Sequence, residues 1–397
     1  MENQYAPQEK GKRELSETIM TDEASTVTGT INEEANLPKH GFGKDQLVAQ
    51  YRAVLHAQAI YYPVAYQFLS ELGRGRQGTV FLGLRQGARG CITRHAIKVY
   101  DPSIYPSAKR YWTDMGRIAS QISKLQSVHD PNLVSRESYD EVNGIGYVQM
   151  EAIDGINLAD FLDGAHIEQV RENSTSEEWA RFTDVIFKEQ GGTIAIQPGV
   201  AIYILRGVLR GLEILHSHGF VHCDVKPSNV MLSRNGYVKI IDYGRAVMID
   251  ENVSFLLGTP NYMAPEVHQR IGSRPESDLF SAGMVGIEML RGERVIPRHL
   301  KSEQELYEFK MQLADRLHEL LPEYVQQNDE LMAMFRLFVH PEMAQRYRSS
   351  GEAEFGELGL AEVHRQLVRL GIDAEYHREL SLYLSKLVDR RINRIDK

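Results

Sequence analysis

Cysteine is scarce in this chain: only Cys91 and Cys223 occur among 397 residues, and they do not form a CxxC pair. This argues against a disulfide framework or a cysteine-based zinc site, and it fits a reducing compartment. No apolar run reaches the roughly 18 residues of a membrane span. The first twenty residues lack the apolar segment of a secretory signal, so we expect neither a membrane span nor a signal peptide.

Positive charge is not in excess either. The net charge is −9, which argues against a general nucleic-acid binder. We find no internal repeat. With 42% hydrophobic and 25% charged residues, the composition is that of an ordinary globular protein, long enough for a two-lobed domain with extensions.

The apolar pattern divides the chain into segments of different character. Residues 1–36 are rich in Glu, Thr, Ser and Asn, and we expect a disordered tail. Residues 37–65 form an extension with a helix near 45–59. A small, mostly antiparallel β lobe is predicted for residues 66–150, with two strands around the turn at Asn143-Gly144.

Helical spacing dominates the rest of the chain. Residues 151–350 form a larger lobe, in which residues 164–198 are interpreted as an inserted helical excursion on the surface. Residues 351–397 are predicted to be a helical extension. Its apolar residues and the nearby arginines either pack against the large lobe, the favoured interpretation, or dock a partner.

Three short motifs follow one another in the middle of the chain. The segment HCDVKPSN spans residues 222–229, DYG spans residues 242–244, and GTPNYMAPE spans residues 258–266. Upstream, GRGRQG at residues 73–78 lies between two predicted strands, unlike a dinucleotide-binding turn. In this order the motifs resemble those of eukaryotic-type (Hanks-type) serine/threonine protein kinases over residues 66–348. The resemblance implies an α+β, bilobal protein kinase-like fold, with a small antiparallel β lobe carrying one main helix and a larger, mostly α-helical lobe.

The resemblance implies roles for four residues in phosphoryl transfer. Asp224 accepts the proton of the acceptor hydroxyl, and Lys226 neutralises charge on the transferring group. Thr259 bridges these two side chains. Lys98, on an apolar strand, binds the α- and β-phosphates of ATP. The expected reaction transfers the γ-phosphoryl group of ATP to serine or threonine hydroxyls of protein substrates.

ATP and a divalent cation are the implied ligands. Asn229 and Asp242 supply oxygen ligands suited to Mg²⁺, with Mn²⁺ as the alternative. The nucleotide is expected to lie between the glycine-rich turn, the walls of an adenine pocket and a hinge. The residues in these positions are Gly73, Gly75, Gly78, Val80, Ala96, Lys98, Met150, Glu151, Ile153, Asn157 and Met231.

Structural partners are also implied by motif position. If Glu266 is buried it needs a cation, because an unpaired buried charge is costly, and Arg346 stands at the matching position. Asp278 matches the aspartate that anchors the backbone of the catalytic loop. Three histidines lie close together in the sequence, at His216, His218 and His222. We favour structural roles for them over a zinc site.

Two residues depart from the family pattern. Gln121 stands where the family has the glutamate that pairs with the lysine. Glutamine can still accept a hydrogen bond from Lys98, but without the charge-assisted part, so we expect a weaker hold on Lys98 rather than its loss. Asp114 lies two turns earlier and would serve only if the helix were shifted. Cys223 replaces an arginine that reads a phosphate on the activation loop, so phosphorylation at Ser254 is less expected as the activating signal. Arg245 is a substitute phosphate partner.

Three functions are therefore compared. An active serine/threonine kinase leads. A nucleotide-binding pseudokinase or scaffold is supported by Gln121 alone. A small-molecule kinase ranks last, because the chain carries the whole GTPxYxAPE-type peptide platform. We expect a cytoplasmic location, with an exported effector acting in another cell's cytosol as the alternative.

Overall fold

The computed structural model describes residues 44–57, 65–190, 193–249, 258–369 and 375–387. The predicted tail, Ser254 and the arginines near the end of the chain lie outside these ranges. The chain divides into two compact units, residues 1–67 with 84–93, and residues 68–83 with 94–397. The described part of the first unit includes helix α2 (Lys44–Ala57), close to the predicted helix. The candidate site residues all belong to the second unit.

A five-stranded sheet forms the small lobe. Its strand order is β1-β2-β3-β5-β4. The strands are β1 (Gln67–Gly75), β2 (Gly78–Gln86), β3 (Ile92–Tyr100), β4 (Arg136–Val142) and β5 (Ile145–Glu151). The link between β4 and β5 is the predicted turn, and both Asn143 and Gly144 have the positive φ that such a turn requires. In the β3–β5 register, Lys98 lies opposite Val148.

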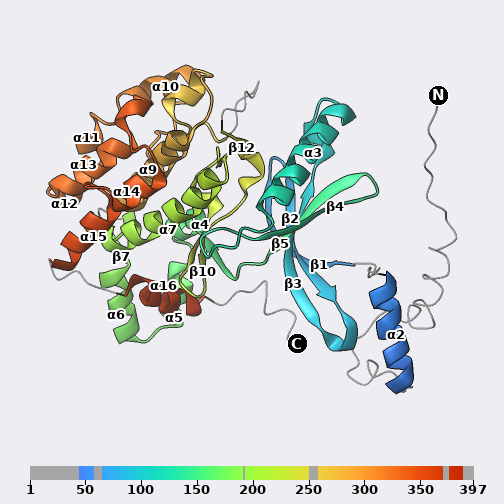
Figure 1. Cartoon of the computed structure of the whole chain (residues 1–397). Helices are drawn as coiled ribbons and strands as arrows, with labels where there is room; N and C mark the ends of the chain where they lie inside the picture. Colours follow the sequence, from blue (N-terminus) through green and yellow to red (C-terminus); the bar gives the residue numbers. More distant parts are fainter. Residues whose placement is uncertain (1–43, 58–64, 191–192, 250–257, 370–374, 388–397) are drawn as a thin grey trace, which may run out of the picture. The chain divides into compact units, whose positions relative to one another are not determined.

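One main helix, α3 (Ala108–Leu125), belongs to this lobe. The Ser107 side chain caps it by accepting a hydrogen bond from the amide of Arg110, 3.2 Å away. Its buried positions recur at intervals of three and four residues, the spacing of one helix face, and this face packs near β4 (Figure 1). The buried residues are Tyr111, Met115, Ile118, Gln121, Ile122 and Leu125. A polar residue therefore stands within the apolar stripe.

Helices dominate the large lobe. Helix α7 (Pro198–Ser217) and helix α9 (Pro275–Arg291) lie side by side within it (Figure 1). Helix α9 is buried from Ser277 to Leu290, which explains its apolar sequence. Close packing needs glycine at Gly283, because a Cβ there would meet the Cβ of Phe338 at 2.5 Å. Further helices of this lobe are α4 (Leu158–Asp163), α8 (Pro265–His268), α10 (Glu303–Met311), α11 (Leu317–Leu320), α12 (Glu323–Gln326), α13 (Asp329–Phe338), α14 (Ser350–Phe355) and α15 (Leu360–Arg369).

Short strands position the catalytic segment on this lobe. A three-stranded sheet has the order β11-β10-β6, and β12 pairs with β9. The strands are β6 (Gly155–Asn157), β9 (Phe220–Val221), β10 (Val230–Ser233), β11 (Val238–Ile240) and β12 (Val247–Met248). Because β10 and β11 form a hairpin, the residues that precede one strand and follow the other are brought together.

The segment 164–198 differs from the surface helical excursion that the sequence predicted. Two helices, α5 (Ile167–Glu172) and α6 (Ser176–Val185), are followed by a hairpin of β7 (Phe187–Gln190) and β8 (Thr193–Ile196). Several of its apolar side chains are buried in the core. The prediction overlooked a hairpin signal, a Gly-Gly pair between two short runs of strand-forming residues.

The final described helix, α16 (Tyr376–Ser385), covers this segment. The ring of Tyr383 lies 5.2 Å from the rings of Phe182 and Phe187, measured between centroids. Arg181 forms an ion pair with the buried Glu379. For residues 375–387, the favoured prediction that the C-terminal helices pack on the large lobe is confirmed.

A hydrogen bond inside this contact provides a test. His166 Nε2 lies 3.0 Å from the carbonyl of Phe161, so it carries the proton, and Nδ1 accepts from the Tyr383 hydroxyl at 2.8 Å. We expect Tyr383→Phe to lower the free energy of unfolding by about 1–2 kcal/mol, because a buried acceptor loses its partner. Urea denaturation measures this. The exposed Tyr237→Phe serves as a control, and equal losses in the two variants would contradict the expectation.

Candidate active site

The glycine-rich turn joins β1 to β2. At Gly73 and Gly75, no atom of the described residues lies within 4 Å of the position a Cβ would take. Gly78 has φ +149°, and a Cβ there would meet the carbonyl oxygen of Val99 at 2.0 Å. Glycine is thus required at Gly78 for packing, and the other two leave open space beside the backbone.

Lys98 is buried on β3 and makes two polar contacts. Its Nζ lies 2.5 Å from Asp242 Oδ1 and 3.2 Å from Gln77 Oε1. The ion pair joins the small lobe to the DYG motif of the large lobe. Gln77 was not predicted as a site residue, although its place inside the glycine-rich turn was a usable signal.

The residues predicted to surround the nucleotide lie on the strands next to this lysine. Ala96 and Met150 are buried cross-strand partners of β3 and β5. Val80 and Ile153 are half-buried against the core. Met231 pairs with Asn157 between β10 and β6.

Two members of the predicted nucleotide set have other partners in the structure. The Asn157 side chain caps helix α4 by accepting from the amide of Asp160 at 2.9 Å. The Glu151 carboxylate forms an ion pair with Lys239 at 3.1 Å. Both side chains therefore have structural roles, in addition to any contact with a nucleotide.

Asp224, Lys226 and Thr259 form a triangle of side chains. The Lys226 ammonium donates to Asp224 Oδ2 and to Thr259 Oγ1, both at 2.9 Å. The Thr259 hydroxyl donates to Asp224 Oδ1 at 2.7 Å. Both carboxylate oxygens are thus engaged, and the carboxylate is held in one orientation.

Asp278 holds the catalytic loop from below. Its two carboxylate oxygens accept from the backbone amides of His222 at 2.7 Å and Cys223 at 2.9 Å. His216 Nε2 contacts the same carboxylate at 2.9 Å. These bonds fix the loop where Cys223 takes a left-handed backbone conformation, with φ 66°. Strained conformations of this kind persist where surrounding contacts support them.

Burial governs the loop's two other titratable groups. It lowers the pKa of His222, so this ring is neutral, and its Nδ1 accepts from the amide of Asp224 at 3.1 Å. It raises the pKa of the Cys223 thiol, which favours the unreactive protonated form. Arg245, considered as a phosphate partner, donates to the carbonyl of Gly258 at 3.0 Å.

Asn229 and Asp242 are brought together by the β10–β11 hairpin, since the amide of Ile241 donates to the carbonyl of Asn229 at 2.9 Å. The Asn229 Nδ2 donates to the carbonyl of Asp224 at 2.8 Å, which leaves its amide oxygen for another partner. Burial alone raises the pKa of Asp242, but Lys98 and then Arg136 outweigh it, and the pKa is lowered. An ionised carboxylate and an amide oxygen, carried by two backbone segments that are hydrogen-bonded to each other, are donors that fit a hard divalent cation.

Gln121 does not accept the hydrogen bond from Lys98 that its position allowed, because the Lys98 ammonium contacts Asp242 and Gln77 instead. Its side chain is buried, and its amide nitrogen donates to the carbonyls of Tyr243 at 2.9 Å and Ala246 at 3.3 Å. Its oxygen accepts from Arg136 at 3.0 Å. Arg136, the first residue of β4, was not predicted as a site residue, and the polar sequence of that strand gave no local signal for it.

Glu266, the last residue of the GTPNYMAPE segment, forms the buried ion pair predicted by motif position. Arg346 donates from two nitrogens to the two carboxylate oxygens of Glu266, both at 2.8 Å. The Ser277 hydroxyl adds a third bond to Glu266 at 2.6 Å. The geometry is bidentate, which is the strong form of an arginine–carboxylate contact.

Lys310, on helix α10, is a second buried basic residue that contacts this segment. Its Nζ donates to the carbonyl of Pro260 at 2.5 Å and lies 2.9 Å from His268 Nε2. Burial lowers the pKa of Lys310 from 10.5 to about 7. It also lowers the pKa of His268 to about 4, with the Lys310 charge adding to the effect.

This arrangement predicts a pH-dependent stability. Between pH 7 and 10.5 the unfolded chain holds a proton on Lys310 that the folded chain lacks. The free energy of unfolding therefore rises with pH in this window, by at most about 1.4 kcal/mol per pH unit. We expect Lys310→Met to remove that rise, so the difference between wild type and variant changes from pH 7 to 9 in urea denaturation. A difference that stays constant over this range would contradict the prediction.

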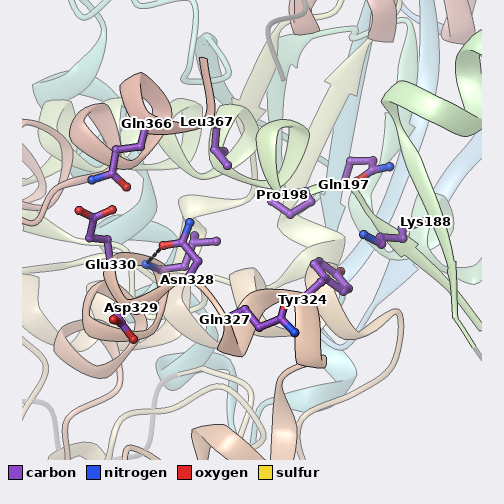
Figure 2. A pocket seen from close by; sticks show the side chains of 11 residues that line it. Lys188, Gln197, Pro198, Tyr324, Gln327, Asn328, Asp329, Glu330, Gln366 and Leu367 are labelled. Carbon is purple, nitrogen blue, oxygen red and sulfur yellow. Dashed lines mark hydrogen bonds between the residues drawn. The ribbon is translucent and has the colours of Figure 1, made fainter. Parts of the chain in front are cut away.

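Other features of the described residues lie apart from this site. Figure 2 shows a pocket of about 700 Å³ on the large lobe, where Lys188 Nζ lies 3.9 Å from the centre of the Tyr324 ring. It is lined by none of the predicted site residues.

Among the described residues, no group of three or more histidine, cysteine or acidic side chains has the geometry of a metal site. Within the same residues, no helix combines the length and apolarity needed to cross a membrane.

Comparison with known proteins agrees with this geometry. Residues 66–351 match the family described as protein kinase domain, which is well over half of the chain. The chain therefore belongs to the protein kinase domain family, and the predicted family and α+β, bilobal fold class are confirmed.

The similar curated proteins carry kinase names. Mitogen-activated protein kinase kinase kinase 17 of Arabidopsis thaliana is 40% identical over 115 residues, covering 29% of this chain and 30% of the relative. Serine/threonine-protein kinase 1 of the same plant is 30% identical over 230 residues, covering 57% and 23%. Serine/threonine-protein kinases drp72 of Corynebacterium efficiens is 27% identical over 208 residues, covering 50% and 34%. The chain thus spans about a third or less of the length of these relatives.

Proposed function

We propose that the chain is an ATP-dependent serine/threonine protein kinase that uses Mg²⁺, with Mn²⁺ as an alternative. The observation that carries the proposal is the triangle of Asp224, Lys226 and Thr259, joined by hydrogen bonds of 2.7–2.9 Å. A further support is the ion pair between Lys98, which we propose to bind phosphate, and Asp242, which we propose as a metal ligand. These are the parts that phosphoryl transfer to a hydroxyl requires.

In the proposed reaction, the hydroxyl oxygen of a serine or threonine forms a bond to the γ-phosphorus of ATP. The bond from that phosphorus to the β–γ bridging oxygen breaks, and ADP leaves. Asp224, held by Thr259 and Lys226, orients the hydroxyl and accepts its proton. Lys226 then neutralises part of the charge on the transferring group.

The remaining residues bind the reactants in this proposal. The backbone at Gly73 and Gly75 has open space for phosphate oxygens. Lys98 binds the α- and β-phosphates, and Ala96 and Met150 contribute to the adenine pocket. The oxygens of Asn229 and Asp242 would hold a divalent cation, whose charge offsets that of the phosphates.

A protein substrate is favoured over a metabolite by the GTPNYMAPE segment. Lys310 anchors this segment at Pro260, and the Glu266–Arg346 ion pair anchors it at its last residue. A serine/threonine acceptor is favoured by Lys226 and Thr259, which bond to each other and to the Asp224 carboxylate. We also propose that the protein acts in the cytoplasm, as its two cysteines and lack of apolar runs lead us to expect.

One observation favours a second candidate, a nucleotide-binding scaffold with weak transfer. Gln121 occupies the position of the family's glutamate and leaves Lys98 without a partner on helix α3. Against it, the catalytic triangle and both candidate metal ligands are present. We therefore retain the scaffold as the alternative outcome.

The proposal is tested by incubating the purified chain with γ-labelled ATP, Mg²⁺ and a generic basic protein. Asp224→Asn is the matched control, since it removes the proton acceptor and keeps the side chain's shape. We expect labelling that the control loses, with phosphate mapped to serine and threonine. Labelling confined to tyrosine would overturn the acceptor assignment, and equal labelling in the control would overturn the proposal.

A further inference from the structure

The surroundings of Gln121 suit an amide and disfavour a carboxylate. Its nitrogen faces two backbone carbonyls, those of Tyr243 and Ala246, which only accept hydrogen bonds. Its oxygen faces the guanidinium of Arg136, which only donates. The neighbours therefore fix the orientation of the amide. A carboxylate in the same rotamer would point one oxygen at two carbonyl oxygens and lose both bonds.

Arg136 completes this contact from strand β4. It is buried, and its guanidinium lies 3.6 Å from the centre of the Tyr243 ring. Its Nε is buried without a hydrogen-bond partner among the described residues. A buried cation needs compensation, and here the Tyr243 ring and the Gln121 oxygen provide it.

Helix α3 makes further bonds to the same backbone. Arg117 donates to the carbonyl of Ala246 at 2.9 Å and to that of Gly244 at 3.0 Å. Its Nε bonds to Asp114 on its own helix at 3.1 Å, so the guanidinium is held in place. Helix α3 is thus fastened to the carbonyls that directly follow Asp242. An open pocket of about 450 Å³ between the helix and this segment is lined in part by Arg117 and Gln121.

We propose that Gln121 and Arg136 are positioning residues that hold helix α3 against the DYG motif and so keep Asp242 in place for catalysis. This inference rests on the proposed kinase function. Gln121 then replaces the lysine–glutamate pair of the family with a different contact, rather than a weakened version of that pair. Lys98 remains available to Asp242 and to phosphate. No phosphate on the activation loop is needed to form the contact, because Arg117 reaches the backbone directly.

The sharpest consequence is that restoring the family residue is harmful. We expect Gln121→Glu to lower kcat about tenfold or more, because two bonds to buried carbonyls are lost. KM for ATP should stay within about threefold, since neither residue is placed in the nucleotide pocket. Arg136→Met should have a similar effect. The double variant should be no worse than the poorer single variant, because the two act as one unit.

One control variant and one measurement that does not depend on activity test the positioning role. Gln126→Glu adds the same charge at the exposed C-terminal cap of helix α3 and should leave kcat within about twofold. Urea denaturation without nucleotide gives a readout independent of activity. If the two residues acted independently, the factors by which Gln121→Glu and Arg136→Met change the unfolding equilibrium constant would multiply in the double variant. We expect the factor for the double variant to be about tenfold smaller than that product.

The outcomes are distinct. If wild type transfers phosphate and Gln121→Glu is equally or more active, the positioning inference is overturned while the kinase proposal stands. If wild type shows no transfer, the kinase proposal fails, and the unfolding data alone then decide whether Gln121 and Arg136 are coupled. Independent effects of the two substitutions on unfolding would overturn the inference.

Discussion

Replacing Asp242 with asparagine is expected to lower the rate of phosphoryl transfer by at least about 1000-fold, or about 4 kcal/mol in activation free energy. The carboxylate lies 2.5 Å from the Lys98 ammonium. Its neighbour Ile241 donates a backbone hydrogen bond to Asn229, the other candidate metal ligand. An asparagine keeps the shape but removes the charge that a divalent cation needs. Initial rates over a series of Mg²⁺ concentrations measure the effect.

The control is Asp140→Asn, which makes the same change at an exposed position of strand β4. It should keep a rate within about twofold of wild type. If Asp242→Asn also stays within a few fold across the Mg²⁺ series, Asp242 is not a metal ligand, and the assignment of the DYG motif must be withdrawn.

The second large effect is on stability. We expect Arg346→Met to lower the free energy of unfolding by about 3–5 kcal/mol, because it leaves the buried carboxylate of Glu266 without its cation. The Arg346 side chain is 0% exposed and that of Glu266 is 7% exposed, so water does not replace the lost bonds. Within the part of the chain that the structure describes, Ser277 alone would remain as a side-chain donor to that carboxylate.

Urea denaturation of Arg346→Met beside Arg348→Met gives the comparison. Arg348 is exposed, so its loss should cost less than about 0.5 kcal/mol. The double variant Glu266→Gln with Arg346→Met should recover part of the loss, because no uncompensated charge remains. A cost below about 1 kcal/mol for Arg346→Met would show that the pair contributes little to stability.

Local sequence signals were sufficient for much of the fold. The Asn143-Gly144 turn depends on two adjacent residues, and the apolar spacing of helices α3 and α7 depends on residues three and four positions apart. Both signals could therefore be recognised in the sequence itself. The family's motif order then supplied the long-range pairings, including Glu266 with Arg346 and the Asp278 anchor.

Features without a family precedent required the structure. Gln121 meets the carbonyl of Tyr243 across 122 positions of sequence, and no local pattern indicates such a contact. Tyr383 meets His166 across 217 positions, which explains why the packing of helix α16 was only one of two predicted outcomes. The hairpin of β7 and β8 was different, because its Gly-Gly signal was local and was overlooked.

These contacts also bear on the choice between enzyme and scaffold. The sequence alone suggests a weakened hold on Lys98, since the glutamate position carries glutamine. The contacts of Gln121 with Tyr243, Ala246 and Arg136 give helix α3 another attachment to the catalytic segment. On this account, the departure at position 121 is compatible with activity.

The most direct test measures nucleotide binding and phosphoryl transfer on the same preparation. Isothermal titration with ATP and Mg²⁺ gives the fraction of chains that bind, and γ-labelled ATP gives the turnover of those chains. We predict that the wild type binds the nucleotide and makes multiple turnovers onto serine or threonine. Asp224→Asn, measured beside it, should bind without transfer. Stoichiometric binding by the wild type with no more transfer than Asp224→Asn would contradict the account and identify the chain as a scaffold.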